Sequence, residues 1–123
     1  MTHFQAVLLP HAGPLSAGQM SRRADVLLSP AQIVYQGIHR GHRPLEQSFL
    51  TVDAPNVVVS AIKQAEDGKG FVVRLVEQGG QQTEGRLVGR LLKTPLKFSL
   101  KPFEIATWRF NNGNARRTNL LER

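Results

Sequence analysis

The run from Asn56 to Glu77 constrains the fold more than any other part of the chain. It reads NVVVSAIKQAEDGKGFVVRLVE, in which two apolar runs rich in β-branched residues flank a polar turn. Such runs favour strands, and the turn, Ala65 to Gly70, places two carboxylates beside two glycines, which tolerate tight bends. We therefore predict a β-hairpin with strands over Val57 to Lys63 and Phe71 to Glu77.

The chain from Glu46 onward continues this β pattern. Leu96, Phe98 and Leu100 alternate with polar residues, which is typical of a strand with one buried face. Asn112-Gly113 is a signal for a tight hairpin turn, and Gly85 and Gly89 indicate bulges or close backbone approach. The further predicted strands are Phe49–Val52, Thr83–Leu92, Leu96–Leu100, Ile105–Phe110 and a last edge strand within Ala115–Arg123, through Leu120-Leu121. This pattern predicts a mostly β fold, an antiparallel β-sandwich.

The N-terminal part carries one helix signal. Ser16 and Gln19 have the Ser-x-x-Gln spacing of a capping box, and apolar residues follow at helical spacing. The predicted short helix ends near Ser29-Pro30, because the residue before a proline disfavours the helical region. Short strands are expected over Phe4–Leu9 and Ile33–Tyr35. We interpret residues 1–123 as a single domain.

The charge of the chain is strongly basic, with 16 Lys and Arg against 9 Asp and Glu and a net charge of +7. The cations are dispersed between apolar strands, without the aromatic and basic pattern of RNA-binding proteins, so nucleic-acid binding is not expected. A solvated or partner-facing basic surface is the favoured interpretation, and a fragment could also owe this charge to a missing acidic partner surface.

Composition also gives an expected location. The sequence has no cysteine, which fits a reducing cytoplasm. It has no apolar run near the roughly 20 residues of a membrane helix and no signal-peptide pattern at its start. We expect a cytoplasmic protein that does not interact with membranes.

No catalytic residue stands out. Glu66-Asp67 is the one adjacent acidic pair, but neighbours in a turn point apart, so a solvated bend is favoured over a catalytic pair. Glu104 begins a predicted strand and is expected to pair with a nearby arginine. His39 and His42 lie three residues apart among arginines, which oppose a divalent cation, so no metal site is expected.

Two aromatic residues could contact a sugar. Trp108 and Tyr35 are the only large amphipathic aromatic residues in the chain. Sugars stack on exposed aromatic rings, but single aromatic residues on predicted strands more often pack in the core. Carbohydrate contact through Trp108 is therefore kept as the minor alternative to core packing.

Several segments together resemble the C-terminal β-sandwich region of glycoside hydrolase family 38, the α-mannosidases. The similar segments, in order, are FQAVLLPHAGP at Phe4–Pro14, Arg23-Ala24 with Ser29-Pro30, Gly41 and Pro44, Ser48-Phe49-Leu50, the hairpin with Ala65-Glu66-Asp67-Gly68, and Pro102-Phe103-Glu104-Ile105 with Thr107. One segment departs from the family order, because a stretch resembling Thr118 to Glu122 usually precedes the Pro-Phe-Glu-Ile strand and here it comes last.

The resemblance implies a supporting role rather than catalysis. Family members hold a catalytic zinc and an aspartate nucleophile in an N-terminal domain, and no position of this sequence matches those motifs. The expected function is that of a non-catalytic C-terminal domain that packs on the catalytic domain of the parent α-mannosidase, with mannosides possible at the domain rim. The chain would then be an isolated piece, a truncated gene product or one half of a split enzyme. The alternatives are a free-standing carbohydrate-binding or protein-interaction module and an independent hydrolase, which would need catalytic acids that the sequence does not offer.

Overall fold

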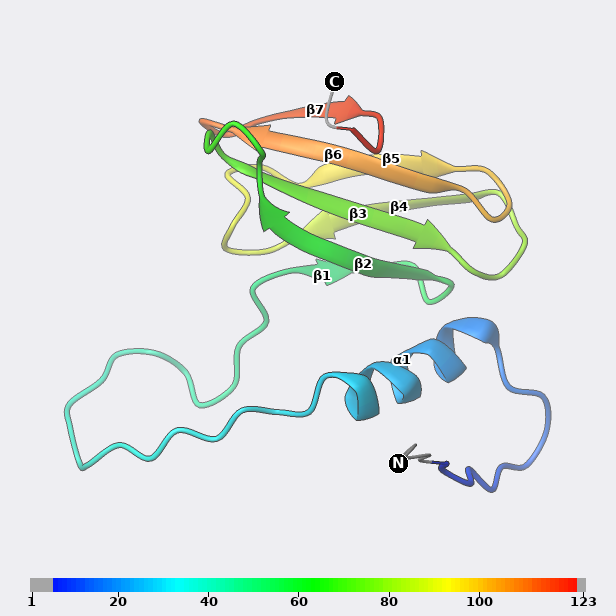
Figure 1. Ribbon diagram of the computed structural model, residues 1–123, viewed down its shortest axis with the longest axis horizontal. Coiled ribbons are helices and arrows are strands. Elements are labelled where there is room, and N and C mark those ends of the chain that lie inside the picture. Colours follow the sequence, from blue (N-terminus) through cyan, green and yellow to red (C-terminus); the bar gives the residue numbers. More distant parts are fainter. Residues whose placement is uncertain (1–5, 122–123) are drawn as a thin grey trace, which may run out of the picture.

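The computed structural model describes residues 6–121, and most of its regular structure is β (Figure 1). Two antiparallel sheets, one with the strand order β2-β3-β6-β7 and one with the order β1-β4-β5, pack face to face as a sandwich. The one helix of the described residues, α1, lies below them in the view of Figure 1. The elements are α1 (Ala17–Leu28), β1 (Thr51–Val52), β2 (Val57–Gln64), β3 (Phe71–Glu77), β4 (Thr83–Val88), β5 (Leu96–Leu100), β6 (Ile105–Asn111) and β7 (Asn114–Thr118).

The predicted hairpin is the centre of the larger sheet. In β2 and β3, Val57 lies opposite Glu77 and Gln64 opposite Phe71, with a register shift between Val59 and Ala61. On its other side β3 pairs with β6, so that Val73 faces Trp108. The near-continuous apolar sequence of β3 fits this position, because Val72 and Val73, which point to opposite faces of the sheet, are both buried.

The core lies between the two sheets. Leu75 of β3 and Trp108 of β6 face Leu87 of β4 and Phe98 of β5, and all four side chains are buried. The rings of Phe98 and Trp108 lie 6.2 Å apart at a tilt of 53°, a favourable aromatic geometry across the two layers. The alternation predicted for Leu96 to Leu100 is confirmed by this inward face.

Most of residues 6–50, which we name the N-terminal segment, lie outside the sandwich (Figure 1), and Leu50 at its end packs against the core. Its helix begins as predicted, because Ser16 and Gln19 form a capping box. The helix meets the sandwich mainly through polar contacts and a close approach of Gly18 to Pro55. The side chains of Arg22 and Ser21 bond Pro55 and Gln78 respectively.

The structure confirms most of the predicted elements and corrects three. The strand expected over Phe4–Leu9 does not form in the described residues 6–9, whereas Phe4 and Gln5 lie outside the described part. The strand expected at Ile33–Tyr35 is also absent, because this extended stretch pairs with no described strand. The last strand ends at Thr118, so Leu120-Leu121 follow it rather than form it.

Smaller boundary differences have local causes. The first strand is only Thr51–Val52 rather than Phe49–Val52. Strand β4 stops at Val88 because the backbone turns at Gly89, where an added Cβ would lie 2.1 Å from the carbonyl oxygen of Phe49. The close backbone approach expected at this glycine is confirmed. Among the described residues, no helix has the length and apolar character needed to cross a membrane.

Candidate functional site

The acidic hairpin turn is a solvated bend, as predicted. The side chains of Glu66 and Asp67 are exposed, and each lies beside a cation: Lys63 for Glu66 and Arg109 for Asp67. The Arg109 guanidinium and the backbone N–H of Lys69 hold the pKa of Asp67 below its usual value. The lowered pKa keeps Asp67 in its charged form rather than in the protonated form that a general acid needs. Both side chains are therefore arranged as ion-paired turn residues.

Glu104 pairs with an arginine, which confirms the expectation for this residue. Its carboxylate accepts hydrogen bonds from the backbone N–H of Lys101 and from the side chain of Arg117. The hydrogen bond from Lys101 has the largest effect, and together with the contact from Arg117 it lowers the pKa of Glu104 against the opposing effect of burial. Arg117 also places its guanidinium 5.4 Å from the ring centroid of Trp108, so one cation joins the β5–β6 loop to the core.

Trp108 itself lies in the core. The residue is 5% exposed, and its ring lies near Phe98 of the opposite sheet and Arg117 of the neighbouring strand β7. Burial of this degree favours the packing interpretation, because a sugar needs an open ring face for stacking. Contact between Trp108 and a sugar stays a prediction. Tyr35, by contrast, is 95% exposed on the N-terminal segment.

Replacing Arg117 with alanine should lower the free energy of unfolding by about 1 kcal/mol, through loss of the cation–π contact and of the partly exposed ion pair. Arg116 is the matched control, because it is the neighbouring arginine on the opposite, exposed face of β7. Urea unfolding followed by Trp108 fluorescence measures both variants. Equal stability of Arg117→Ala and Arg116→Ala would show that the contact with Trp108 contributes nothing.

Glu77 is the polar centre of the sandwich end opposite the hairpin turn, and sequence reasoning missed it. Its side chain is 1% exposed. Oε1 accepts hydrogen bonds from the Asn56 amide at 2.7 Å and the Gly79 N–H at 2.6 Å. Oε2 accepts from the N–H groups of Gly80, Gln81 and Phe103, at 2.8, 3.3 and 2.9 Å. The carboxylate therefore joins three loops, β1–β2, β3–β4 and β5–β6.

These hydrogen bonds keep Glu77 charged without a cation. Burial acts to raise the pKa of the Glu77 carboxyl, but the donors from Phe103, Asn56, Gly79 and Gly80 together outweigh it, so the pKa lies below its usual value. A signal for this residue was present in the sequence. Phe71, Val73, Leu75 and Glu77 alternate on one face, so period-2 reasoning places the carboxylate inward, directly before a glycine turn.

The histidines form no metal centre in the described chain. His39 contacts the carbonyl oxygen of Arg40 and the side chain of Gln36, and His11 contacts the carbonyl oxygen of Gly13. Within residues 6–121 no group of three or more His, Cys, Asp or Glu side chains is placed to hold a metal ion. The described histidines therefore lie apart, each with its own local hydrogen-bond partners.

The N-terminal segment presents an apolar surface that the sandwich does not cover. In α1 the only buried residue is Gly18, while Leu28 is 81% exposed. Beyond the helix, Ile33 and Tyr35 are each 95% exposed. The exposed large apolar residues of this segment are Val7, Leu8, Leu9, Met20, Val26, Leu27, Leu28, Ile33, Val34, Tyr35, Ile38, Leu45 and Phe49. So many exposed large apolar side chains in one segment are typical of a region that another part of a protein covers.

Comparisons with known proteins agree with the β-sandwich geometry. A family model described as "Glycosyl hydrolases family 38 C-terminal beta sandwich domain" matches residues 56–123, more than half of the chain. "Alpha-mannosidase G" of Dictyostelium discoideum is 28% identical over 89 residues, which cover 54% of this chain and 8% of that relative. The chain therefore spans a small fraction of the relative's length. No solved structure matches.

Proposed function

Because the chain belongs to the glycosyl hydrolase family 38 C-terminal β-sandwich family, we propose that it is the non-catalytic C-terminal domain of an α-mannosidase-type glycoside hydrolase. Its role is to pack on the zinc-dependent catalytic domain and support it. The reaction itself, hydrolysis of α-mannosides, belongs to that other domain. The proposal is supported most by the uncovered apolar surface of the N-terminal segment.

That surface has the composition of a domain interface. A helix normally buries its apolar stripe against a neighbour, whereas α1 meets the sandwich through Gly18 and polar side chains and leaves Met20, Val26 and Leu27 exposed. The extended run Ile33-Val34-Tyr35 has strand-forming residues but no partner strand among the described ones. An exposed extended run and an exposed apolar helix face together fit a large neighbouring surface of the same protein.

Catalysis is absent from this role for a chemical reason. Glycoside hydrolysis normally uses two carboxyl groups across one scissile bond. Here Glu77 is buried and fully engaged by its donors, and Asp67 and Glu104 are each held by an arginine. We expect the isolated chain, supplied with zinc, to leave an aryl α-mannoside unhydrolysed. Turnover that purified with the chain would contradict the proposal.

A binding experiment tests whether the chain packs on the catalytic region. The chain should form a stable complex with the separately expressed catalytic region of a family 38 α-mannosidase from the same organism. Val26→Asp and Leu27→Asp should weaken this complex at least tenfold, because each places a charge within an apolar interface. Ser60→Asp, at an exposed position of β2, is the matched control. Retained binding in both α1 variants would assign the interface elsewhere.

A titration with mannose oligosaccharides distinguishes the supporting domain from the alternative, a free-standing carbohydrate-binding module. Titration with mannose oligosaccharides should leave the fluorescence of Trp108 unchanged, because its ring is buried between Phe98 and Arg117. A saturable change would favour the carbohydrate-binding alternative and would also revive the predicted sugar contact at Trp108.

A further inference from the structure

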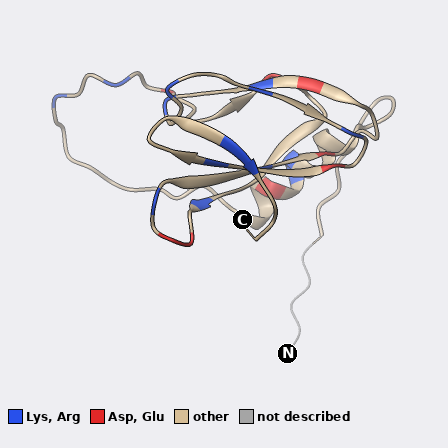
Figure 2. Cartoon of the chain, turned by 90° about the horizontal axis from the view of Figure 1, so that it is seen from above, with Lys and Arg blue, Asp and Glu red and all other residues tan. Residues whose placement is uncertain are grey.

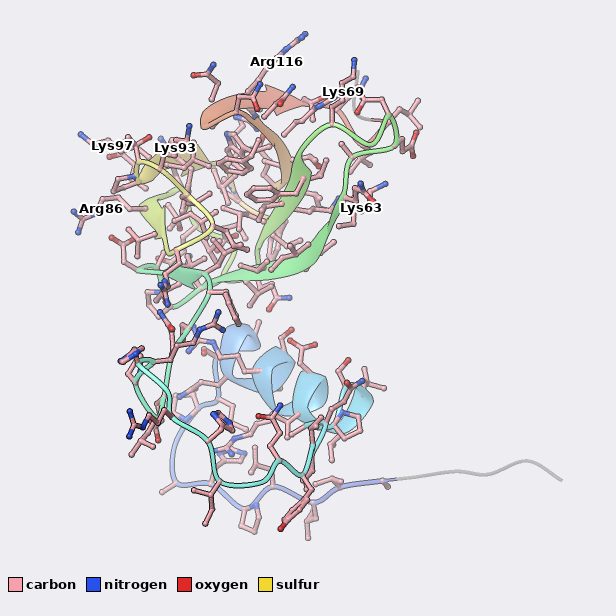
Figure 3. The ribbon with its side chains drawn as sticks, turned by 90° about the vertical axis from the view of Figure 1, so that its left-hand side faces the viewer. Lys63, Lys69, Arg86, Lys93, Lys97 and Arg116 are labelled. Carbon is pink, nitrogen blue, oxygen red and sulfur yellow. The ribbon has the colours of Figure 1, made fainter. Side chains whose placement is uncertain are left out.

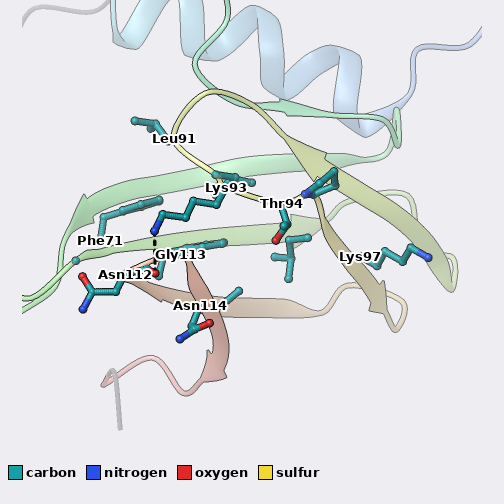
Figure 4. Close-up of a pocket in the computed structure, with 14 residues that line it drawn as sticks. Phe71, Leu91, Lys93, Thr94, Lys97, Asn112, Gly113 and Asn114 are labelled. Carbon is teal, nitrogen blue, oxygen red and sulfur yellow. Dashed lines mark hydrogen bonds between the residues drawn. The ribbon is translucent and has the colours of Figure 1, made fainter.

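A pocket opens at the end of the sandwich that carries the β2–β3 turn. Its volume is about 510 Å³, and it lies between the β4–β5 loop and the β6–β7 turn (Figure 4). The aromatic wall is made by Phe71 and Phe110, whose stacked rings lie 4.9 Å apart. Leu91 and Pro95 add apolar surface from the loop. A pocket of this size holds one or two side chains of a ligand.

One lysine is fixed at the rim of this pocket. The stem of Lys93 lies against Gly113 so closely that an added Cβ there would be 2.3 Å from its Cδ. The Lys93 ammonium donates to the carbonyl oxygen of Asn112 at 3.3 Å (Figure 4). An ammonium has three donors, so this arrangement holds the charge in place and leaves donors for a further acceptor.

The surroundings of the pocket are cationic. Figure 3 places Lys69, Lys93, Lys97 and Arg116 around this side of the sandwich, and none of the lining residues is acidic. Across the whole chain, Figure 2 shows Lys and Arg spread over strands and loops rather than gathered on one element. A uniformly basic surface has only a positive potential. This pocket has a defined shape and an apolar wall in addition.

We propose that this pocket binds an acidic peptide segment, with a carboxylate on Lys93 and an apolar side chain against Phe71 and Leu91. The ligand class follows from the combination of a fixed ammonium, an apolar wall and a lining without carboxylates. Amide side chains at Asn112 and Asn114 and the hydroxyl of Thr94 supply further partners for a peptide backbone. The inference uses none of the residues that carry the proposed packing on a catalytic domain.

Fluorescence anisotropy with the full chain tests this inference. The probe is a short fluorescein-labelled peptide in which aspartate alternates with leucine. We expect saturable binding that weakens at least tenfold when asparagine replaces each aspartate, and likewise when alanine replaces each leucine. Binding of a single-stranded oligonucleotide with equal affinity would overturn the proposal, because it would reduce the pocket to a general anion surface.

Matched variants locate the site. Lys93→Met should weaken peptide binding at least tenfold, and Lys93→Arg should retain most of it by keeping the charge. Lys101→Met removes the same charge from the β5–β6 end of the sandwich and should have little effect. Leu91→Ala should weaken binding to the leucine peptide alone. Equal affinities for Lys93→Met and Lys101→Met, with both variants folded by their thermal unfolding curves, would place the peptide elsewhere.

Discussion

Replacing Glu77 with glutamine should lower the free energy of unfolding by about 3 kcal/mol, the largest effect expected from an isosteric change in this chain. The two carboxylate oxygens accept five hydrogen bonds, from Asn56, Gly79, Gly80, Gln81 and Phe103. Glutamine replaces one oxygen by an NH₂ group, which is a donor facing donors. At least two buried N–H groups then lose their acceptor, at about 1–3 kcal/mol each.

Glu84→Gln is the matched control, because it makes the same chemical change on the exposed face of β4. Its effect should stay within about 0.5 kcal/mol. Urea unfolding followed by Trp108, which is buried and is the only tryptophan of the chain, measures both variants. If Glu77→Gln were as stable as Glu84→Gln, the three loops would not depend on this carboxylate.

The same residue predicts a pH dependence with a definite sign. The pKa of Glu77 is lowered in the folded chain, so its charged form stabilises the fold. That stability is fully present above the ordinary pKa of a glutamate and is lost as the pH falls through the folded pKa. Native chain should therefore lose more stability below about pH 4 than Glu77→Gln does. Parallel curves for the two proteins in urea unfolding across this range would contradict the assignment.

Replacing Gly70 with alanine should destabilise the sandwich by several kcal/mol, since two effects combine at this position. Gly70 has a φ of +88°, which costs an L-residue about 1–2 kcal/mol. An added Cβ would also lie 1.9 Å from the carbonyl oxygen of Phe110. Because Phe110 belongs to the β6 backbone and pairs with Phe71, neither side can move without opening the central sheet.

Gly68 gives the control for this prediction within the same turn. Its φ of +74° imposes the same backbone cost, but an added Cβ would meet nothing within 4 Å. Gly68→Ala should therefore cost only about 1–2 kcal/mol, and the difference between the two variants measures the clash with β6. Equal unfolding free energies in urea would show that the hairpin turn does not pack against Phe110 as described.

This pair of glycines illustrates where sequence reasoning stops. In the sequence, Gly68 and Gly70 are equivalent turn residues, and the local pattern predicted their turn correctly. What separates them is the pairing of β3 with β6, a contact between positions about forty residues apart along the chain. Local propensity contains no information on contacts between positions so far apart in the sequence. The difference in unfolding free energy between Gly68→Ala and Gly70→Ala therefore depends on the tertiary arrangement.

The strand predictions succeeded where the pattern was long and apolar. Phe71–Glu77 and Leu96–Leu100 match the structure, since burial of one face enforces the alternation that identified them. The stretch Ile33–Tyr35 has equally good strand-forming residues, yet it pairs with nothing among the described ones. A strand needs a partner, and propensity alone does not supply one.

Site residues were harder to predict than strands. The expected roles of Glu66, Asp67 and Glu104 follow from turn and strand-edge chemistry and agree with the structure. Glu77 ends the predicted strand Phe71–Glu77, and its buried role is not among the predictions. Such a role is unusual, because charged residues are almost never fully buried. Its role depends on donors from three separate loops, and those loops meet only after the two sheets pack.

Amide hydrogen exchange tests the central proposal, packing of this domain on a catalytic region, most directly. In the isolated chain, residues 6–50 should exchange quickly, because most of their backbone is irregular and exposed, whereas β3 and β6 should be strongly protected. On addition of the catalytic region of a family 38 α-mannosidase from the same organism, α1 and residues 30–45 should become protected while the sandwich core stays unchanged. Unaltered exchange across residues 6–50 in a mixture that contains the bound complex would contradict the account.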